Sequence, residues 1–377
     1  MKAMKRHIAY IVVLVIIFTL AIPVFAHGNR QEIHSDTECL LEGSQNHEYI
    51  HFAKVAASST NSVTTITTKK LLDLNGNYFE LVETGECGYL IFDPQSGKYL
   101  EEALDSPSPY LGLDHDLYYL GPLNYYQLKD GAYVHTLFPE GNSISSDVAK
   151  AIQTGFDVSL QRSRSQPDSR ILDEVQGSPS SVRQLDLQEY FSTMRATNEY
   201  IQDYGYIKDA VFPKNQGNTC GYVAACLILN YWHNHERPII DDSFLDSDGN
   251  LKKDGYTLQD KLLSYGDSDT SWGKTIRDAL IAYCKEYGVS ASSTYYVTNY
   301  DIAAEVSRGR PIILFGNFPE NPGEVPTRGS LNHAVTAYGV SSSGLFKKFI
   351  VHYGWPGYGH VTLDGGLVGS STQFILN

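Results

Sequence analysis

Two short segments that lie far apart in the sequence constrain this chain more than any other feature. In the first, Asn215 to Gly221, Cys220 stands where a polar loop passes into an apolar, helix-like run. In the second, Leu331 to Val335, His333 stands directly before an apolar, strand-like run. A fold that brings the two segments together pairs a thiol with an imidazole, which is the pair that nucleophilic thiol chemistry requires.

The run that follows Cys220 has helical periodicity. Val223, Leu227 and Tyr231 recur at every fourth position, which predicts a helix with a buried face. Cys220 would open that helix, where unpaired backbone N–H groups and the helix dipole stabilise a thiolate and lower the pKa of the thiol. His333, arriving from a separate strand, would complete the ion pair and later protonate the leaving amine.

The N-terminus predicts export. At 377 residues the chain is long enough for two folded units. A basic start, an apolar run from Ile8 and the ending Val24-Phe25-Ala26 predict a signal peptide at residues 1–26, cleaved after Ala26. The apolar run is long for such a peptide, so an uncleaved membrane anchor is the alternative. Either way, we expect the rest of the chain to be secreted or held at the extracellular face of the cell membrane or cell wall.

Charge and cysteine content narrow the function further. The net charge of −14 argues against a nucleic-acid partner, because such binding depends on Lys and Arg. Five cysteines do not make a dense disulfide framework, although Cys39 and Cys87 could pair with each other. Cys220, Cys226 and Cys284 form an odd set, consistent with one functional thiol, and Cys226 is interpreted as a small buried hydrophobic residue.

Residues 27–155 predict a small, β-rich N-terminal domain. Apolar runs alternate with turn sequences such as Asn75-Gly76, as they do in antiparallel hairpins. These runs are residues 78–82, 88–92 and 98–100. Tyrosines crowd residues 117–126, where carbohydrate binding could use the rings, but a packed surface is their commoner role.

From about Gly155 to Arg183 the composition shifts to Ser, Gln, Pro and Arg, which predicts an exposed linker at residues 156–194. An exposed linker is open to proteolysis. The order of signal, N-terminal domain, linker and C-terminal domain is therefore that of a zymogen, with the N-terminal domain as an intramolecular inhibitor. A tether between two permanent domains is the alternative.

Residues 195–377 predict helices first and strands later. A helical repeat runs from Trp272 to Tyr283, and strand candidates follow at 312–315, 334–338 and 349–351. A helical lobe that carries the thiol and an antiparallel β lobe that carries the histidine would place the site in the cleft between them. The predicted fold class is therefore α+β with two lobes, preceded by the β-rich domain.

Several fragments of this region resemble the papain-like cysteine peptidase superfamily. Leu331 to Gly339 is similar to the segment around the catalytic histidine of papain-family peptidases. Thr219 to Ala225 resembles the helix start of bacteriocin-processing peptidases, and Ile350 to Gly357 resembles the Asn-Trp-Gly-Trp-Gly stretch of streptopain-like peptidases. Gly309 to Ile313 also recurs before the histidine strand in such proteins. The fragments keep their order and spacing over most of residues 205–377.

The resemblance implies roles for four residues. Cys220 would be the nucleophile and His333 the general acid and base. Gln216 would form the oxyanion hole with the backbone N–H of Cys220, although it stands closer to the cysteine than in papain, and a plain loop glutamine is the alternative. His352 falls where relatives have the asparagine that orients the imidazole, and a neutral His352 could accept the ring N–H of His333.

The histidine at position 352 is the largest departure from the relatives. A protonated His352 would repel an imidazolium, so we expect activity to fall at acid pH as this ring becomes charged. The orienting group could instead be absent or lie elsewhere, with Asn332 a poor substitute because it adjoins His333 on one strand and should point away. Trp355 would shield this part of the site, as the matching tryptophan does in the relatives.

We expect no cofactor and no bound metal. The cluster from His233 to Glu236 lacks a second ligand group with zinc spacing, and residues 246–250 begin a loop without the glycine and glutamate of a calcium site. Thiol chemistry needs neither ion.

The sequence thus predicts an exported cysteine endopeptidase, made as a precursor, whose substrates are extracellular or cell-surface polypeptides. A cell-wall amidase is the second enzymatic possibility, because murein-cleaving thiol hydrolases also place the cysteine before the histidine. A surface binding protein that keeps the fold without turnover is the non-enzymatic alternative.

Overall fold

The computed structural model describes residues 67–83, 88–96, 98–103, 105–137, 139, 143–165, 198–213, 219–266, 272–296, 302–315, 333–341 and 348–377. The predicted signal peptide, Cys39, Cys87, Gln216 and Asn332 lie outside these residues. We refer to residues 67–165 as the N-terminal part and to residues 198–377 as the C-terminal part. Among the described helices, none is both long and apolar enough to cross a membrane.

The described N-terminal part is a run of short strands followed by a helix. The elements are β1 (Thr67–Leu72), β2 (Tyr78–Glu83), β3 (Tyr89–Asp93), β4 (Lys98–Ala103), β5 (Leu117–Tyr119), β6 (Tyr125–Lys129), β7 (Ala132–His135), β8 (Ser143–Ile144) and α4 (Ser146–Arg164). β1 to β4 pair antiparallel in sequence order, which confirms the predicted hairpins. In the turn between β1 and β2, Gly76 has a φ of +81°, a conformation that glycine adopts without steric cost.

The helix α4 corrects the predicted start of the linker. Its buried stripe consists of residues spaced four apart, Ile152, Phe156 and Leu160. Near its end, Arg162 donates a hydrogen bond to the carbonyl of Val368 in the C-terminal part. Residues 156–164 are therefore a packed amphipathic helix and not exposed linker. The Ser, Gln and Arg residues around these apolar positions, some of them also buried, hid the apolar stripe in the composition.

The C-terminal part has helices first and strands later, as predicted. The elements are β9 (Asn198–Tyr200), α7 (Gly205–Lys208), α8 (Cys220–His235), η1 (Asp242–Phe244), α9 (Leu258–Leu263), α10 (Gly273–Glu286), β10 (Ala291–Tyr296), α11 (Ile302–Ser307), β11 (Ile312–Phe315), β12 (Ala334–Ser341), β13 (Lys348–His352), β14 (Val361–Asp364), η2 (Gly365–Leu367) and β15 (Ser370–Leu376). The three predicted strand segments lie in β11, β12 and β13, and the predicted helical repeat lies in α10.

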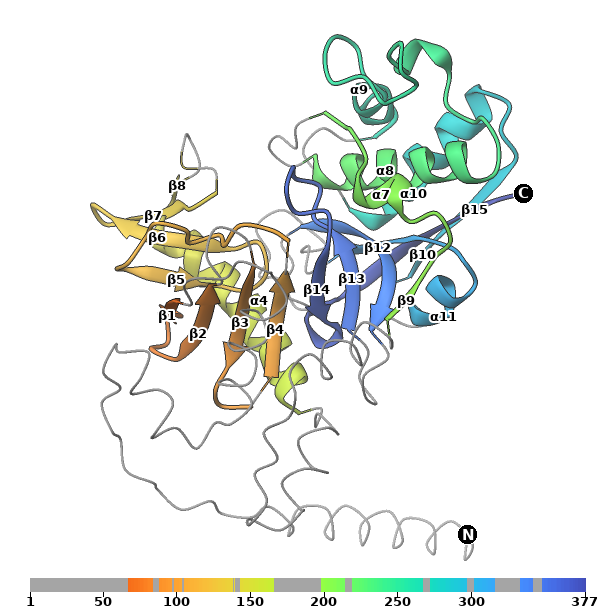
Figure 1. Ribbon diagram of the computed structural model, residues 1–377. Coiled ribbons are helices and arrows are strands. Elements are labelled where there is room, and N and C mark those ends of the chain that lie inside the picture. The colour runs from red at the N-terminus through yellow and green to blue at the C-terminus, as the bar shows by residue number, and fades with distance from the viewer. Residues whose placement is uncertain are drawn as a thin grey trace, which may run out of the picture.

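One sheet joins the two parts. Its described strands follow the order β10-β15-β11-β12-β13-β14-β4-β3-β2-β1-β5-β6-β7-β8, with β9 paired to β12. The junction is an antiparallel pairing of β4 with β14, in which Glu101 lies opposite Leu363 and Glu102 opposite Thr362. Figure 1 shows β4 beside β14, with α8 and α10 over the C-terminal strands and α4 beside the N-terminal strands. The fold is therefore mixed α and β around a large sheet.

The helix α8 is the centre of the C-terminal core. Each residue from Cys220 to Trp232 is buried, so the helix is covered on all sides and not only on the predicted face. A helix that is apolar all round is typical of a buried position in a larger domain.

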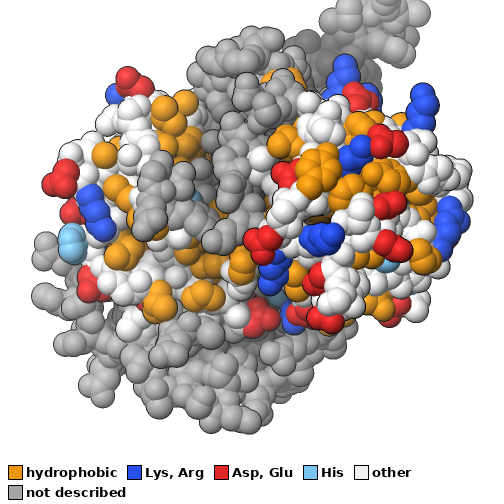
Figure 2. Space-filling view, turned by 90° about the horizontal axis from the view of Figure 1, so that it is seen from above, with side chains coloured by type: hydrophobic (Ala, Val, Ile, Leu, Met, Phe, Trp, Pro, Cys, Tyr) orange, Lys and Arg blue, Asp and Glu red, His pale blue; other side chains and the backbone are white. Residues whose placement is uncertain are grey.

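On the molecular face in Figure 2, the described Lys and Arg side chains over the C-terminal part are interspersed with Asp and Glu.

Candidate active site

Cys220 is the first residue of α8, as the sequence predicts. The carbonyl of Thr219 accepts the N–H groups of Tyr222 and Val223 at 3.0 and 3.1 Å, which closes the first turn. The cysteine is 5% exposed. A thiol in this position lies at the positive end of the helix dipole, which favours the thiolate.

The start of β12 lies against this helix end. The backbone N–H of Ala334 donates to the sulfur of Cys220 at 3.4 Å. Further along, the hydroxyl of Thr336 donates to the carbonyl of Ala224 at 3.4 Å, which fixes the strand to the helix a second time. The two segments singled out in the sequence therefore meet, and His333 is the residue directly before the one that contacts the sulfur.

The ring of His333 has a defined hydrogen-bond partner. Its Nε2 lies 3.0 Å from the backbone carbonyl of Tyr353. A carbonyl only accepts, so Nε2 carries the proton and Nδ1 is the unprotonated nitrogen of the neutral ring. Burial lowers the pKa of His333 to about 4, against the opposite effect of this bond. The ring is therefore neutral near pH 7 in this state and has the tautomer of a base acting through Nδ1.

The hydrogen bonds of His352 differ from those of the orienting role that the sequence suggested. Its Nδ1 accepts the backbone N–H of Gly354 at 2.8 Å, while the ring N–H of His333 goes to the carbonyl of Tyr353. Burial lowers the pKa of His352 to about 3. The expected loss of activity through charging of this ring therefore cannot set in until the pH is strongly acid.

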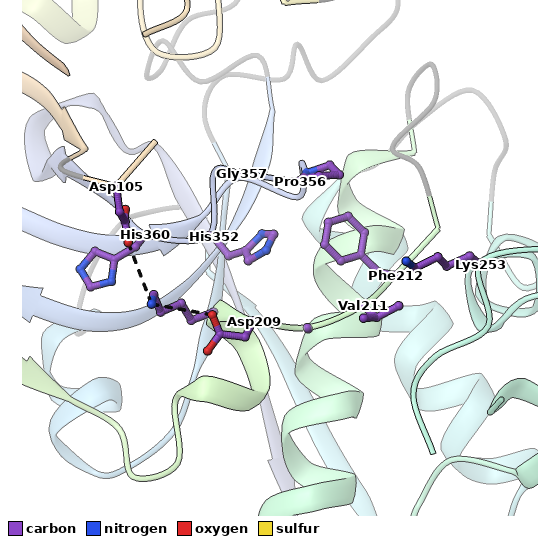
Figure 3. A pocket seen from close by; sticks show the side chains of 12 residues that line it. Asp105, Asp209, Val211, Phe212, Lys253, His352, Pro356, Gly357 and His360 are labelled. Atoms are coloured by element: carbon purple, nitrogen blue, oxygen red, sulfur yellow. Dashed lines mark ion pairs between the residues drawn. The ribbon is translucent and has the colours of Figure 1, made fainter. Parts of the chain in front are cut away.

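His352 instead lines a cavity of about 390 Å³ next to the loop that precedes α8. Figure 3 shows the ring pointing toward Phe212, with their centroids 5.2 Å apart and the rings nearly perpendicular. On another side of this cavity, Lys208 forms ion pairs with Asp105 and Asp209 at 4.0 and 3.7 Å. Asp105 belongs to the N-terminal part, so both parts of the chain line this cavity.

Trp355 covers His333, in keeping with the shielding that the resemblance implies. The two rings lie 4.9 Å apart, and Trp355 is 8% exposed. The tryptophan also lies near His135 of β7, whose ring is 6.1 Å away. Burial lowers the pKa of His135, and His333 is one of the groups that add to this effect. The N-terminal part thus reaches the surroundings of His333.

The other described cysteines have a different environment. Cys226 is fully buried, and burial raises the pKa of its thiol, with Asp260 adding to the effect. Burial also raises the pKa of Cys284 to about 12. Both thiols are therefore poor nucleophiles near neutral pH, and the interpretation of Cys226 as a small buried residue is confirmed.

The cluster from His233 to Glu236 at the end of α8 makes hydrogen bonds within the fold. Nδ1 of His233 accepts the backbone N–H groups of Ile239 and Ile240 at 3.1 and 2.9 Å, and His235 pairs with Asp203 at 3.0 Å. Within the described ranges, His, Cys, Asp and Glu side chains do not gather in groups of three that could hold a metal ion.

Sequence reasoning missed three groups near His333. The acceptor carbonyl of Tyr353 has no sequence signal, because every residue has a carbonyl. His135 lies in an ordinary strand of the N-terminal part, and its position was not foreseen. Glu101 had no sequence signal, because β4 contains three charged residues and its burial along the whole length is seen only in the structure.

No family model matches the chain, and no curated protein does. Among solved structures, the chain is similar to a C39-like peptidase from Bacillus anthracis, with 13% identity over 48% of this chain and 98% of that chain and a TM-score of 0.27. It is also similar to a fragment of prointerpain A from Prevotella intermedia, with 12% identity, coverage of 82% and 98% and a TM-score of 0.39. A third similarity is to digestive procathepsin L 3 of Tenebrio molitor larval midgut, with 14% identity, coverage of 62% and 95% and a TM-score of 0.24. Because these TM-scores are low, any functional assignment rests on the side chains of the chain itself.

Proposed function

We propose that this chain is a cysteine peptidase in which Cys220 is the nucleophile and His333 the general base and acid. The observation that carries the proposal is the junction of α8 with β12, where the N–H of Ala334 donates to the sulfur of Cys220. A thiol at a helix start, beside a histidine whose tautomer is set by a carbonyl, is the arrangement from which a thiolate nucleophile is generated.

The proposed reaction follows from the two nitrogens of His333. Nδ1 accepts the thiol proton while the sulfur attacks the carbonyl carbon of the substrate. The carbonyl of Tyr353 accepts a hydrogen bond from the Nε2–H group before and after this transfer, so the imidazolium keeps its orientation. The imidazolium then protonates the leaving amine, and water hydrolyses the resulting thioester to release the acid and restore the thiol. The backbone N–H of Cys220 and the side chain of Gln216 are the proposed donors to the oxyanion.

We propose further that the chain is exported and made as a precursor that the N-terminal part restrains. Three observations support the restraint by the N-terminal part. Cys220 is 5% exposed, the ring of His135 lies 6.1 Å from Trp355, and burial keeps His333 neutral. Cleavage between residues 166 and 197 would relieve the restraint by letting the N-terminal part shift and open the site, while the β4–β14 pairing keeps the two parts associated. The substrates would be extracellular or cell-surface polypeptides.

The test is mass spectrometry of the chain from residue 27 onward, incubated with and without an irreversible inhibitor of thiol peptidases. We expect an adduct on Cys220, cleavage between residues 166 and 197, and turnover of peptide substrates by the cleaved protein. Cys220→Ala should lose the adduct and at least about a thousand-fold of the turnover, because the covalent step has no other nucleophile.

Cys226→Ala is the matched control, since it removes a buried thiol from the same helix. This variant should keep the adduct on Cys220 and the turnover. Folded protein that forms no adduct before or after linker cleavage would overturn the peptidase proposal in favour of a binding protein. Cleavage of muropeptides but not of peptides would replace it with a cell-wall amidase.

A further inference from the structure

The N-terminal part contributes a buried carboxylate beside the segment that holds His333. Glu101 of β4 is 1% exposed. Its Oε1 accepts the hydroxyl groups of Tyr89 at 3.3 Å, Tyr125 at 2.5 Å and Tyr353 at 2.6 Å. Tyr89 and Tyr125 belong to the N-terminal part and Tyr353 to the C-terminal part, so one carboxylate oxygen bridges the two.

The hydrogen bonds of this bridge are held in place because each buried polar group would be costly to leave without a partner. A buried carboxylate is costly unless hydrogen bonds compensate it, and here the donors are hydroxyl groups. Burial raises the pKa of Glu101, and the hydrogen bonds of Tyr125 and Tyr353 act in the opposite direction. Burial also raises the pKa of Tyr353 well above its ordinary value, so its hydroxyl stays protonated and donates. If the hydroxyl of Tyr353 moved away, Glu101 would lose a donor that water cannot readily replace.

Tyr353 begins a short closed loop. Its N–H donates to the carbonyl of Tyr358 at 2.9 Å, and the N–H of Tyr358 donates to the carbonyl of Trp355 at 3.1 Å. The bend is possible because Gly354 and Gly357 adopt φ values of +77° and +82°. The loop 353–358 therefore behaves as one unit, in which a shift of Tyr353 also moves Trp355.

Both tyrosines of this loop are anchored in the N-terminal part. The hydroxyl of Tyr358 donates to the carbonyl of Pro107 at 2.8 Å, as that of Tyr353 donates to Glu101. The two rings are nearly parallel, with an interplanar angle of 8° and centroids 6.3 Å apart. The pairing of β4 with β14 holds the N-terminal part beside this loop (Figure 1).

We propose that Glu101 is a positioning residue for His333 and acts through Tyr353. The hydroxyl of Tyr353 donates to Glu101. The backbone carbonyl of Tyr353 accepts a hydrogen bond from Nε2 of His333 at 3.0 Å. Glu101 does not touch the reacting atoms. It holds the loop in the position from which the carbonyl sets the tautomer of the ring. This inference rests on the proposed function and adds that the N-terminal part completes the site as well as covering it.

The test compares two tyrosines that donate to the same oxygen of Glu101. Tyr353→Phe removes the hydroxyl that joins the loop to Glu101, and Tyr125→Phe removes a hydroxyl at a matched distance from a residue of β6, outside the loop. The readout is the rate at which iodoacetamide alkylates Cys220 in the full chain, followed by mass spectrometry from pH 5 to pH 9. At pH 6 the reaction depends on His333 as base, whereas near pH 9 the thiol ionises without help.

In Tyr353→Phe we expect the alkylation rate at pH 6 to fall about ten-fold and the rate at pH 9 to change less than about two-fold. Tyr125→Phe should keep the shape of the wild-type profile although it also removes a hydrogen bond to Glu101. Equal profiles for the two variants would overturn the inference, because a purely structural role of the cluster predicts equal effects.

Two further variants keep the question answerable if Tyr353→Phe does not fold. Glu101→Gln retains an acceptor oxygen for Tyr353 and should keep the wild-type profile, whereas Glu101→Ala removes the acceptor and should lose rate at pH 6.

His333→Ala distinguishes a failure of the proposed function from a failure of the inference about Glu101. If wild type and His333→Ala have the same profile, the proposed function fails. If only His333→Ala loses rate at pH 6, the inference about Glu101 alone fails.

Discussion

The two halves of the candidate site are built in different ways. The cysteine half is the start of α8 against β12, and the two hydrogen bonds that join this helix to the strand link residues of the C-terminal part. The histidine half is the loop 353–358, and its two tyrosine hydroxyls both bond to the N-terminal part. The proposed nucleophile therefore depends on local helix formation, while the loop beside the proposed base is held by contacts between sequence regions far apart. Under the proposals above, the N-terminal part supports the site as well as covering it.

The largest expected effect concerns linker cleavage. With a specific protease site introduced between residues 166 and 197, cleavage should leave the two fragments associated. The reason is that the β4–β14 pairing, the Glu101 cluster and the packing of α4 all remain. Size-exclusion chromatography of the cleaved protein should give one peak at the elution volume of the intact chain. Separate elution of the N-terminal fragment, with full peptidase activity in the other, would show that the histidine half needs no support from outside the C-terminal part.

The helix α4 offers a second test of how firmly the N-terminal part is held. Phe156→Ala should lower the free energy of unfolding by about 3 to 5 kcal/mol, because it leaves a cavity at a fully buried position. Val158→Ala, on the same helix but 41% exposed, should change it by less than about 0.5 kcal/mol. Denaturant unfolding measures both. Similar small changes would return residues 156–164 to the exposed linker that composition predicted.

The smallest expected effect is a pH dependence of stability that comes from His352. His352 has an ordinary pKa of 6.5 in the unfolded chain and one of about 3 when folded. Between these values the unfolded state binds the additional proton, so stability falls as the pH drops below about 6.5. From pH 7 to pH 4.5 this residue alone should remove about 2 to 3 kcal/mol.

His352→Asn should therefore lose about 2 to 3 kcal/mol less than wild type over this pH interval, as measured by denaturant unfolding at both pH values. The pH profile of turnover above pH 5 should keep its shape in this variant, since the orienting acceptor is the carbonyl of Tyr353. A turnover profile shifted by the substitution would restore the orienting role of His352.

Much of the fold could be predicted because the relevant signals are local. The helix that opens at Cys220, the hairpins of β1 to β4 and the strands β11 to β13 follow from apolar spacing and turn residues. The start of the linker was misplaced because average composition outweighed the four-residue spacing of Ile152, Phe156 and Leu160. The helix α8 was expected to bury one face, and its burial on all sides reflects neighbours that no local pattern reveals.

By itself, the sequence determined that a cysteine opens a helix and that a histidine precedes a strand, because hydrogen bonding and apolar periodicity within a segment decide such elements. Only the tertiary structure decided what orients the histidine. The acceptor is the backbone carbonyl of Tyr353, and the hydroxyl of the same residue is bound to a glutamate of another part of the chain. Main-chain groups are the same in every residue, and a buried carboxylate acquires its partners only when the sheet closes.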